Sequence, residues 1–171
     1  DNNNSNAKLM GNCSLNTSSN CTSEYNANGG LDIINAHEAY DQGYTGKDVI
    51  VAVADGGFDT DHPDLKDNFI TGYDQTDGDN NVDQKSYTNM SHGTHVAGII
   101  AGSKNGLGMH GVAPDAKIMP IKLFYDSGTM VAEANNAVQY AIDNDAFVVN
   151  NSWGTEQQLK NDVRGWSLQC N

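Results

Sequence analysis

The segment "SHGTHVAGIIAG", residues 91–102, places two histidines three residues apart at the head of an apolar, glycine-containing run. They could be metal ligands on one helix, a catalytic base beside a structural neighbour, or packed core histidines. The helical zinc motif uses histidines at i and i+4 with a glutamate between them, so the spacing of His92 and His95 disfavours zinc. At a helix N-terminus the dipole disfavours the imidazolium form. This position would therefore keep His92 neutral and able to act as a base.

Asp55 has a side chain that could pair with a histidine. It ends the apolar, β-branched run "DVIVAVAD" and is followed at once by Gly56 and Gly57, so the chain can turn sharply there. A buried carboxylate is costly unless it is paired and hydrogen-bonded, and an imidazole N–H is one suitable partner. The alternative is an aspartate that only caps the following turn.

The elements that must position these residues alternate along the chain. Continuous apolar runs predict buried strands, and apolar residues at helical spacing predict helices. The predicted strands are 48–55, 116–124 and 146–154, and the predicted helices are 31–43, 91–102 and 129–145. This order predicts an α/β fold with a parallel, doubly wound sheet and helices on both faces, with functional groups at the carboxyl ends of the strands.

Two of the predicted helices carry more specific expectations. In the helix 31–43 we expect Asp32 as the N-cap and Gly43 as the stop. In the helix 129–145 we expect one buried stripe, made of Val131, Ala134, Val138, Ala141 and Ile142.

The charge balance limits the classes of partner. Nine basic and 22 acidic residues give a net charge of −13. This argues against nucleic acid and anionic membrane surfaces, because the chain cannot neutralise phosphates. It is compatible with a secreted or cell-surface protein and with binding of hard cations. No apolar stretch approaches the roughly 20 residues of a membrane-spanning helix.

The first 30 residues differ from the rest. They are rich in Asn and Ser, and we expect an extended or loop-like arm (1–30), held by a disulfide between Cys13 and Cys21, before a domain at 31–171. Such a staple is typical of exported proteins. Cys170 is then left over, which suggests a partner elsewhere. The alternative is three unpaired thiols.

Four segments, "VAVADGGFDTDHPDL", "SHGTHVAGIIAG", "GVAPDAKIMPIK" and "VVNNSWG", together resemble the subtilisin-like serine peptidases, or subtilases. The resemblance covers roughly residues 46–154. It implies that Asp55 orients the imidazole, that His92 is the general base of an Asp-His-Ser triad, and that His95 is a structural neighbour. Gly56 departs from the pattern, since the family usually has Thr or Ser there, which removes a hydroxyl donor to the carboxylate.

The nucleophile of the family lies in a G-T-S-x-A segment, which the 171 residues do not contain. We therefore expect the N-terminal part of a secreted serine endopeptidase, with the serine on a remaining C-terminal part and with protein or peptide as substrate. The 171-residue chain alone should be inactive. The alternative is a non-catalytic subtilase-like module that binds peptides.

The resemblance also implies a substrate groove, in which extended segments pair with the bound peptide. "NSWG" matches one segment, through Ser152, Trp153 and Gly154, and "DSG" could supply the other, through Ser127 and Gly128. Trp153 could instead be a core aromatic.

A calcium site is implied as well, with oxygen ligands suited to a hard cation. Its expected ligands are the side chains of Asp64 and Asn105 and the carbonyls of Ser103, Leu107 and Met109. A second acidic loop with Asp77, Asp79 and Asp83 could bind calcium, although a solvated loop is the favoured interpretation.

Overall fold

The computed structural model describes residue 13 and residues 18–83, 90–123 and 130–153. The chain forms two compact units. Unit 1 comprises residues 1–49, 60–69 and 97–118, and unit 2 comprises residues 50–59, 70–96 and 119–171. The expected boundary near residue 30 lies within unit 1.

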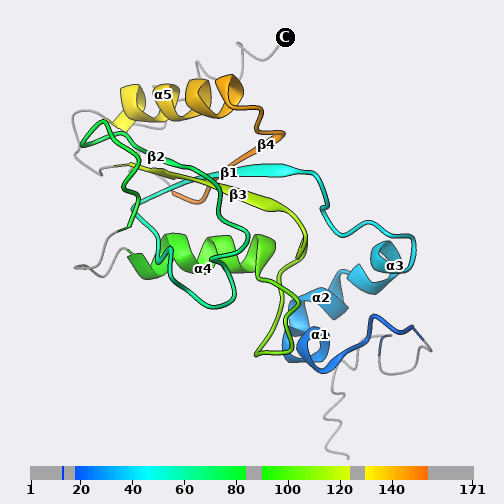
Figure 1. The fold of residues 1–171 in the computed structure, drawn as a ribbon. Helices are drawn as coiled ribbons and strands as arrows, with labels where there is room; N and C mark the ends of the chain where they lie inside the picture. The colour runs from blue at the N-terminus through cyan, green and yellow to red at the C-terminus, as the bar shows by residue number, and fades with distance from the viewer. Residues whose placement is uncertain (1–12, 14–17, 84–89, 124–129, 154–171) are drawn as a thin grey trace, which may run out of the picture. The chain divides into compact units, whose positions relative to one another are not determined.

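A four-stranded sheet is the centre of unit 2 (Figure 1). The strands β1 (Ile50–Asp55), β2 (Tyr73–Asp74), β3 (Lys117–Lys122) and β4 (Val148–Asn151) are arranged in the order β2-β3-β1-β4. β1 pairs with β4 in parallel, with Ala54 opposite Asn151, and β2 pairs with β3 in parallel. The predicted parallel α/β fold is confirmed, with β2 as a strand that the sequence pattern did not indicate.

Helices lie on both sides of this sheet. α5 (Met130–Asp143) lies on one side, and the first half of α4 (Met90–Ala101) lies on the other (Figure 1). The buried core of unit 2 contains small residues of α5 and larger apolar residues of β3. Its members are Ala52, Ala54, Met119, Ile121, Leu123, Ala137 and Ala141. The alanines let α5 pack closely on the strands.

One expectation for this region was correct in part and one was wrong. Ala134 and Ala141 of the expected helical stripe are buried, together with Ala137, and Val138 is partly buried, but Ile142 is 60% exposed because it lies beside the buried row. The side chain of Val131 lies outside the described residues. β4 is not a buried strand: Val148 is 47% exposed, and β4 is an edge strand of the described sheet. An apolar run does not by itself distinguish an edge strand from a central one.

The described part of the arm, residue 13 and residues 18–30, includes helical segments. It contains α1 (Ser23–Ala27), for which the Thr22 hydroxyl caps the Tyr25 N–H at 3.3 Å, and the start of α2 (Gly29–Ile33); α3 (Ala36–Asp41) follows the arm. The single helix predicted at 31–43 is interrupted by Asn35, whose φ of 53° is left-handed. Asn28, rather than Asp32, caps α2.

Aromatic rings fill the core of unit 1. Tyr25 is fully buried, and its ring makes edge contacts with His37 and Tyr40 at centroid distances of 6.1 and 6.2 Å. The Tyr40 hydroxyl donates to the Val112 carbonyl at 2.7 Å. Burial raises the pKa of Tyr40 to about 12 and also raises the pKa of Tyr25. The rings therefore stay neutral and hold the short helices together.

Cys13 and Cys21 are joined by a disulfide, with Cα atoms 5.7 Å apart, and Cys13 belongs to this aromatic core. Cys170 lies outside the described residues. Among the described helices, none has the length and apolar character that crossing a membrane requires.

Candidate active site

The carboxyl end of β1 places Asp55 in a buried position. Its side chain is 1% exposed, and its Oδ1 accepts a hydrogen bond from the Gly56 N–H at 2.7 Å. The Asp55 carbonyl accepts from the Leu123 N–H at 2.8 Å, which ties this end of β1 to the segment after β3. Gly57 then takes a φ of 134° to turn the chain. The backbone N–H of Gly56 thus supplies a donor at the position where a hydroxyl side chain is absent.

His92 faces this carboxylate from α4. Its Nδ1 lies 2.9 Å from Oδ2 and 3.0 Å from Oδ1 of Asp55. An ionised carboxylate only accepts hydrogen bonds, so Nδ1 is the donor in this contact. A neutral ring with this donor has its lone pair at Nε2. The imidazole is 54% exposed while the carboxylate is 1% exposed. The pair therefore consists of a fixed, buried anion and a base that solvent or a reactant can reach.

Gly93 allows α4 to approach the end of β1 closely. A Cβ atom at Gly93 would lie 2.4 Å from the Gly57 carbonyl oxygen and 3.1 Å from the Asp55 Cβ. The next residue, Thr94, accepts a hydrogen bond from the Asp59 N–H through its Oγ1 at 2.9 Å. The first turns of α4 are thus held against the loop that follows β1.

The described part of α4 begins at Met90 and includes Ser91 and His92. His95 is exposed on the helix surface.

Trp153 lies beside the same strand. Its Nε1 donates to the Ala54 carbonyl at 3.1 Å, and the half-buried ring packs against the core of unit 2. Its indole is thus part of the core packing. Ser152 is exposed, and its Oγ accepts from the Asn150 amide at 2.8 Å. Gly154, Ser127 and Gly128 lie outside the described residues.

Four of the residues expected to bind calcium, Asp64, Ser103, Asn105 and Leu107, are linked by hydrogen bonds in unit 1. The Asp64 carbonyl accepts from the Ser103 N–H at 2.8 Å, and its Oδ1 accepts from the Asn105 amide at 3.0 Å. The Asn105 Oδ1 accepts from the Leu107 N–H at 3.0 Å. Leu107 and Met109 are 59% and 53% exposed, so their apolar side chains are not what fixes this loop.

Sequence reasoning did not find a second carboxylate at this loop. Glu24 of α1 is 6% exposed, and its Oε1 accepts from the Asn105 N–H at 3.0 Å. The only available signal was that Glu24 is the single acidic residue between Asp1 and Asp32. Asn105 thus contacts two carboxylates, those of Asp64 and Glu24, and oxygen groups of this kind suit a hard cation.

A buried ion pair that the sequence pattern did not indicate joins β2 and β3, at the start of the acidic loop of unit 2. Lys122 donates to the Oδ2 of Asp74 at 2.6 Å, with exposures of 8% and 0%. The Asp74 Oδ1 also accepts from the Thr76 N–H at 2.8 Å. Asp77 and Asp79 are exposed, while Asp83 is partly buried.

Comparisons with known proteins show which family this chain resembles in sequence and fold. The sequence model described as the Subtilase family matches residues 46–171. An extracellular serine protease of Serratia marcescens is 40% identical over 147 residues, covering 84% of this chain and 13% of that protein. The major intracellular serine protease of Bacillus subtilis is 37% identical over 148 residues, covering 81% of this chain and 46% of that protein.

A solved structure of a serine protease from Aeromonas sobria, in complex with a chaperone, superposes with a TM-score of 0.60 at 31% identity, covering 74% of this chain and 21% of that chain. The chain thus spans less than half the length of these relatives. The match over residues 46–171 covers most of the chain. The chain belongs to the subtilase family.

Proposed function

We propose that the chain forms the N-terminal part of the catalytic domain of a secreted serine endopeptidase, with Asp55 and His92 as two members of an Asp-His-Ser triad. The observation that carries the proposal is the contact of the His92 Nδ1 with both carboxylate oxygens of Asp55, at 2.9 and 3.0 Å. The serine would lie on a remaining C-terminal part, which is consistent with the 13–46% of the curated relatives that the chain spans.

In this mechanism the His92 Nε2 takes the proton of the serine hydroxyl as the oxygen attacks the peptide carbonyl. The imidazolium then gives that proton to the departing amine. Asp55 stays ionised, holds the Nδ1–H tautomer and stabilises the imidazolium. Burial of Asp55 strengthens this effect, because the local dielectric constant is lower than that of water. The exposure of His92 leaves room for serine and substrate at Nε2.

Calcium has a structural part in this proposal. Asp64, Asn105 and the carbonyls of Ser103, Leu107 and Met109 would hold the ion, and Glu24 is an added candidate ligand because it already contacts Asn105. A bound Ca²⁺ would neutralise the two carboxylates and fix the loop against α1. Secretion is supported by the extracellular relative, by the disulfide and by the acidic composition. Protein or peptide is the proposed substrate.

An active-site-directed fluorophosphonate on the full-length protein tests the catalytic proposal. We expect labelling of a serine outside these 171 residues. Asp55→Asn should lower kcat by about 10⁴-fold through the wrong tautomer, and His92→Ala by about 10⁶-fold. His95→Ala is the matched control, since His95 is exposed on the same helix, and its activity should be unchanged.

Failure to label a folded, full-length sample would favour the alternative, a peptide-binding module without turnover. The isolated 171-residue chain should not hydrolyse peptides. Hydrolysis by that chain that is abolished in His92→Ala would contradict the assignment of the nucleophile to further sequence.

A further inference from the structure

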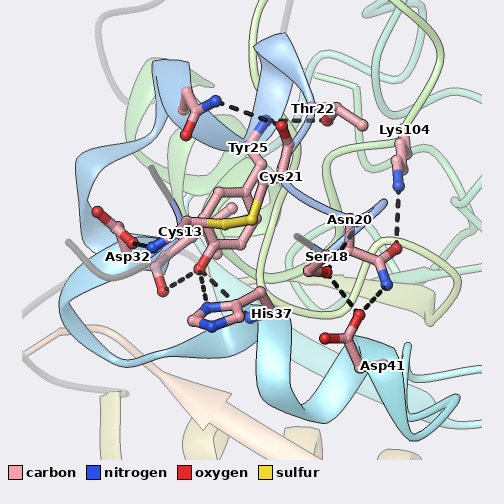
Figure 2. The surroundings of a disulfide bond; sticks show 12 residues. Cys13, Ser18, Asn20, Cys21, Thr22, Tyr25, Asp32, His37, Asp41 and Lys104 are labelled. Carbon is pink, nitrogen blue, oxygen red and sulfur yellow. Dashed lines mark hydrogen bonds between the residues drawn. A yellow bond between two sulfur atoms is a disulfide. The ribbon is translucent and has the colours of Figure 1, made fainter. Parts of the chain in front are cut away.

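Two side chains of metal-binding type, Asp32 and His37, lie beside the disulfide of unit 1 (Figure 2). The Cys13 sulfur, a carboxylate oxygen of Asp32 and a ring nitrogen of His37 all lie within 4.8 Å of one another. The Cys21 sulfur lies one S–S bond from that of Cys13, outside the group in which every pair of ligand atoms is within 4.8 Å. Thiolate, imidazole and carboxylate are the ligand types of zinc. The proposed peptidase mechanism uses none of these residues.

The cluster is held by its surroundings rather than by the disulfide alone. Asp32 accepts a hydrogen bond from the Cys13 N–H at 3.1 Å, which keeps its carboxylate beside the sulfur. The Tyr25 hydroxyl lies 3.2 Å from the His37 Nδ1 and accepts from the His37 N–H at 3.3 Å. Contacts of this kind orient metal-binding histidines. Cys13 and His37 are 2% and 1% exposed, so an ion here would be shielded from water on most sides.

We propose that reduction of the Cys13–Cys21 disulfide converts this cluster into a tetrahedral zinc site with Cys13, Cys21, Asp32 and His37 as its four ligands. A phosphine reductant supplies the two electrons and becomes the phosphine oxide, with its oxygen taken from water. The S–S bond breaks to give two thiols. Zinc binding then releases the two thiol protons and forms two Zn–S bonds. The ion and the disulfide are alternative ways to close the same loop.

The geometry requires only local adjustment. Tetrahedral zinc places its ligand atoms about 3.3–3.8 Å apart. The ligand atoms of Cys13, Asp32 and His37 now lie within 4.8 Å of one another, so shifts of roughly 1 Å suffice for these three. The Cys21 sulfur must move farther, from bonding distance of the Cys13 sulfur to about 3.8 Å from it, which a side-chain rotation after reduction can supply. Two thiolates, one carboxylate and a neutral imidazole carry three negative charges, which Zn²⁺ reduces to one. The proposal does not depend on the peptidase assignment.

Metal titration of the full chain tests it, in a Cys170→Ser background so that Cys13 and Cys21 are the remaining cysteines. Zn²⁺ and the spectroscopic probe Co²⁺ are added to the oxidised and phosphine-reduced forms, with calcium present throughout to occupy oxygen sites. We expect one Zn²⁺ to bind at least 100-fold more tightly to the reduced form. Co²⁺ should give thiolate charge-transfer bands and the intense visible bands of tetrahedral coordination. Equal affinity of the two forms would overturn the proposal.

Variants then separate a four-ligand site from binding by two cysteines. Asp32→Asn keeps an oxygen acceptor for the Cys13 N–H, and His37→Gln keeps a polar group near Tyr25. Each should weaken Zn²⁺ binding at least tenfold in the reduced form. Asp41→Asn is the control, because Asp41 is an exposed carboxylate of the same unit that bonds Ser18 and Asn20. If Asp32→Asn, verified as folded by circular dichroism, binds Zn²⁺ like the parent, the four-ligand site is ruled out.

Discussion

Gly93→Ala should separate His92 from Asp55 while leaving both side chains intact. The added Cβ would lie 2.4 Å from the Gly57 carbonyl oxygen, and Cβ atoms essentially never lie within 3.0 Å of such an atom. The start of α4 must therefore move by at least about 0.6 Å. If the movement is directed away from β1, the contacts of 2.9 and 3.0 Å from Nδ1 to the carboxylate lengthen to about 3.5 Å, beyond ordinary hydrogen-bond range.

The expected change in the free energy of unfolding of Gly93→Ala follows from two opposing effects. Overpacking of this kind costs about 1–3 kcal/mol, whereas replacing a helical glycine by alanine gains up to about 1 kcal/mol. Gly98→Ala on the same helix is the matched control, because a Cβ there meets nothing within 4 Å. The difference between the two variants therefore isolates the clash and should be about 1–3 kcal/mol, or roughly 2–12 °C in Tm.

Two measurements check the predicted effects of Gly93→Ala. Thermal unfolding gives the difference in stability, and proton NMR detects the Nδ1–H of His92, which should be lost to faster exchange with water in Gly93→Ala alone. In the complete peptidase we expect a loss of about 100-fold in kcat/KM from a misplacement of this size. A Gly93→Ala variant as stable as Gly98→Ala, with the Nδ1–H resonance unchanged, would refute the reasoning.

Three further predictions concern the stability of the two units. Replacing both Cys13 and Cys21 by serine should cost about 2–3 kcal/mol, because the disulfide closes a loop of 8 residues; urea unfolding measures this, and an unchanged midpoint would contradict it. Lys122→Met should cost about 3–5 kcal/mol by leaving the Asp74 carboxylate buried and unpaired, and the same assay should show that adding Asp74→Asn recovers part of the loss. The pKa of Tyr40, raised to about 12 from 10.0, makes the folded state hold its proton more tightly than the unfolded state. Its contribution to stability is complete below pH 10 and is lost as the pH rises toward 12, which tyrosinate absorbance in the parent and in Tyr40→Phe can follow.

The sequence predicted the elements around the site because their signals are local. A continuous apolar run ending in Asp55 and a glycine-rich helix starting near His92 each carry their own pattern. The arm was misjudged because α1 has five residues, too few for a periodic pattern, and depends on the burial of Tyr25. The break at Asn35 needs a left-handed backbone, which asparagine adopts readily but does not require.

Contacts between distant residues were the least predictable part of the site. Glu24 meets Asn105 across 81 residues of sequence, and Lys122 meets Asp74 across 48. No periodicity encodes such a pair, since each residue looks like an ordinary polar or charged surface residue in its own segment. The Asp55–His92 pair was accessible only because two motifs of one family identify its members.

The hydrogen bond from the Leu123 N–H to the Asp55 carbonyl makes opening of the site measurable by hydrogen exchange. Leu123 is 4% exposed, so its amide hydrogen exchanges with deuterium only when the ends of β1 and β3 separate. The protection factor of this one amide therefore reports how often the aspartate is released from its position. A substrate or inhibitor that needs Asp55 in place should slow this exchange in proportion to its occupancy.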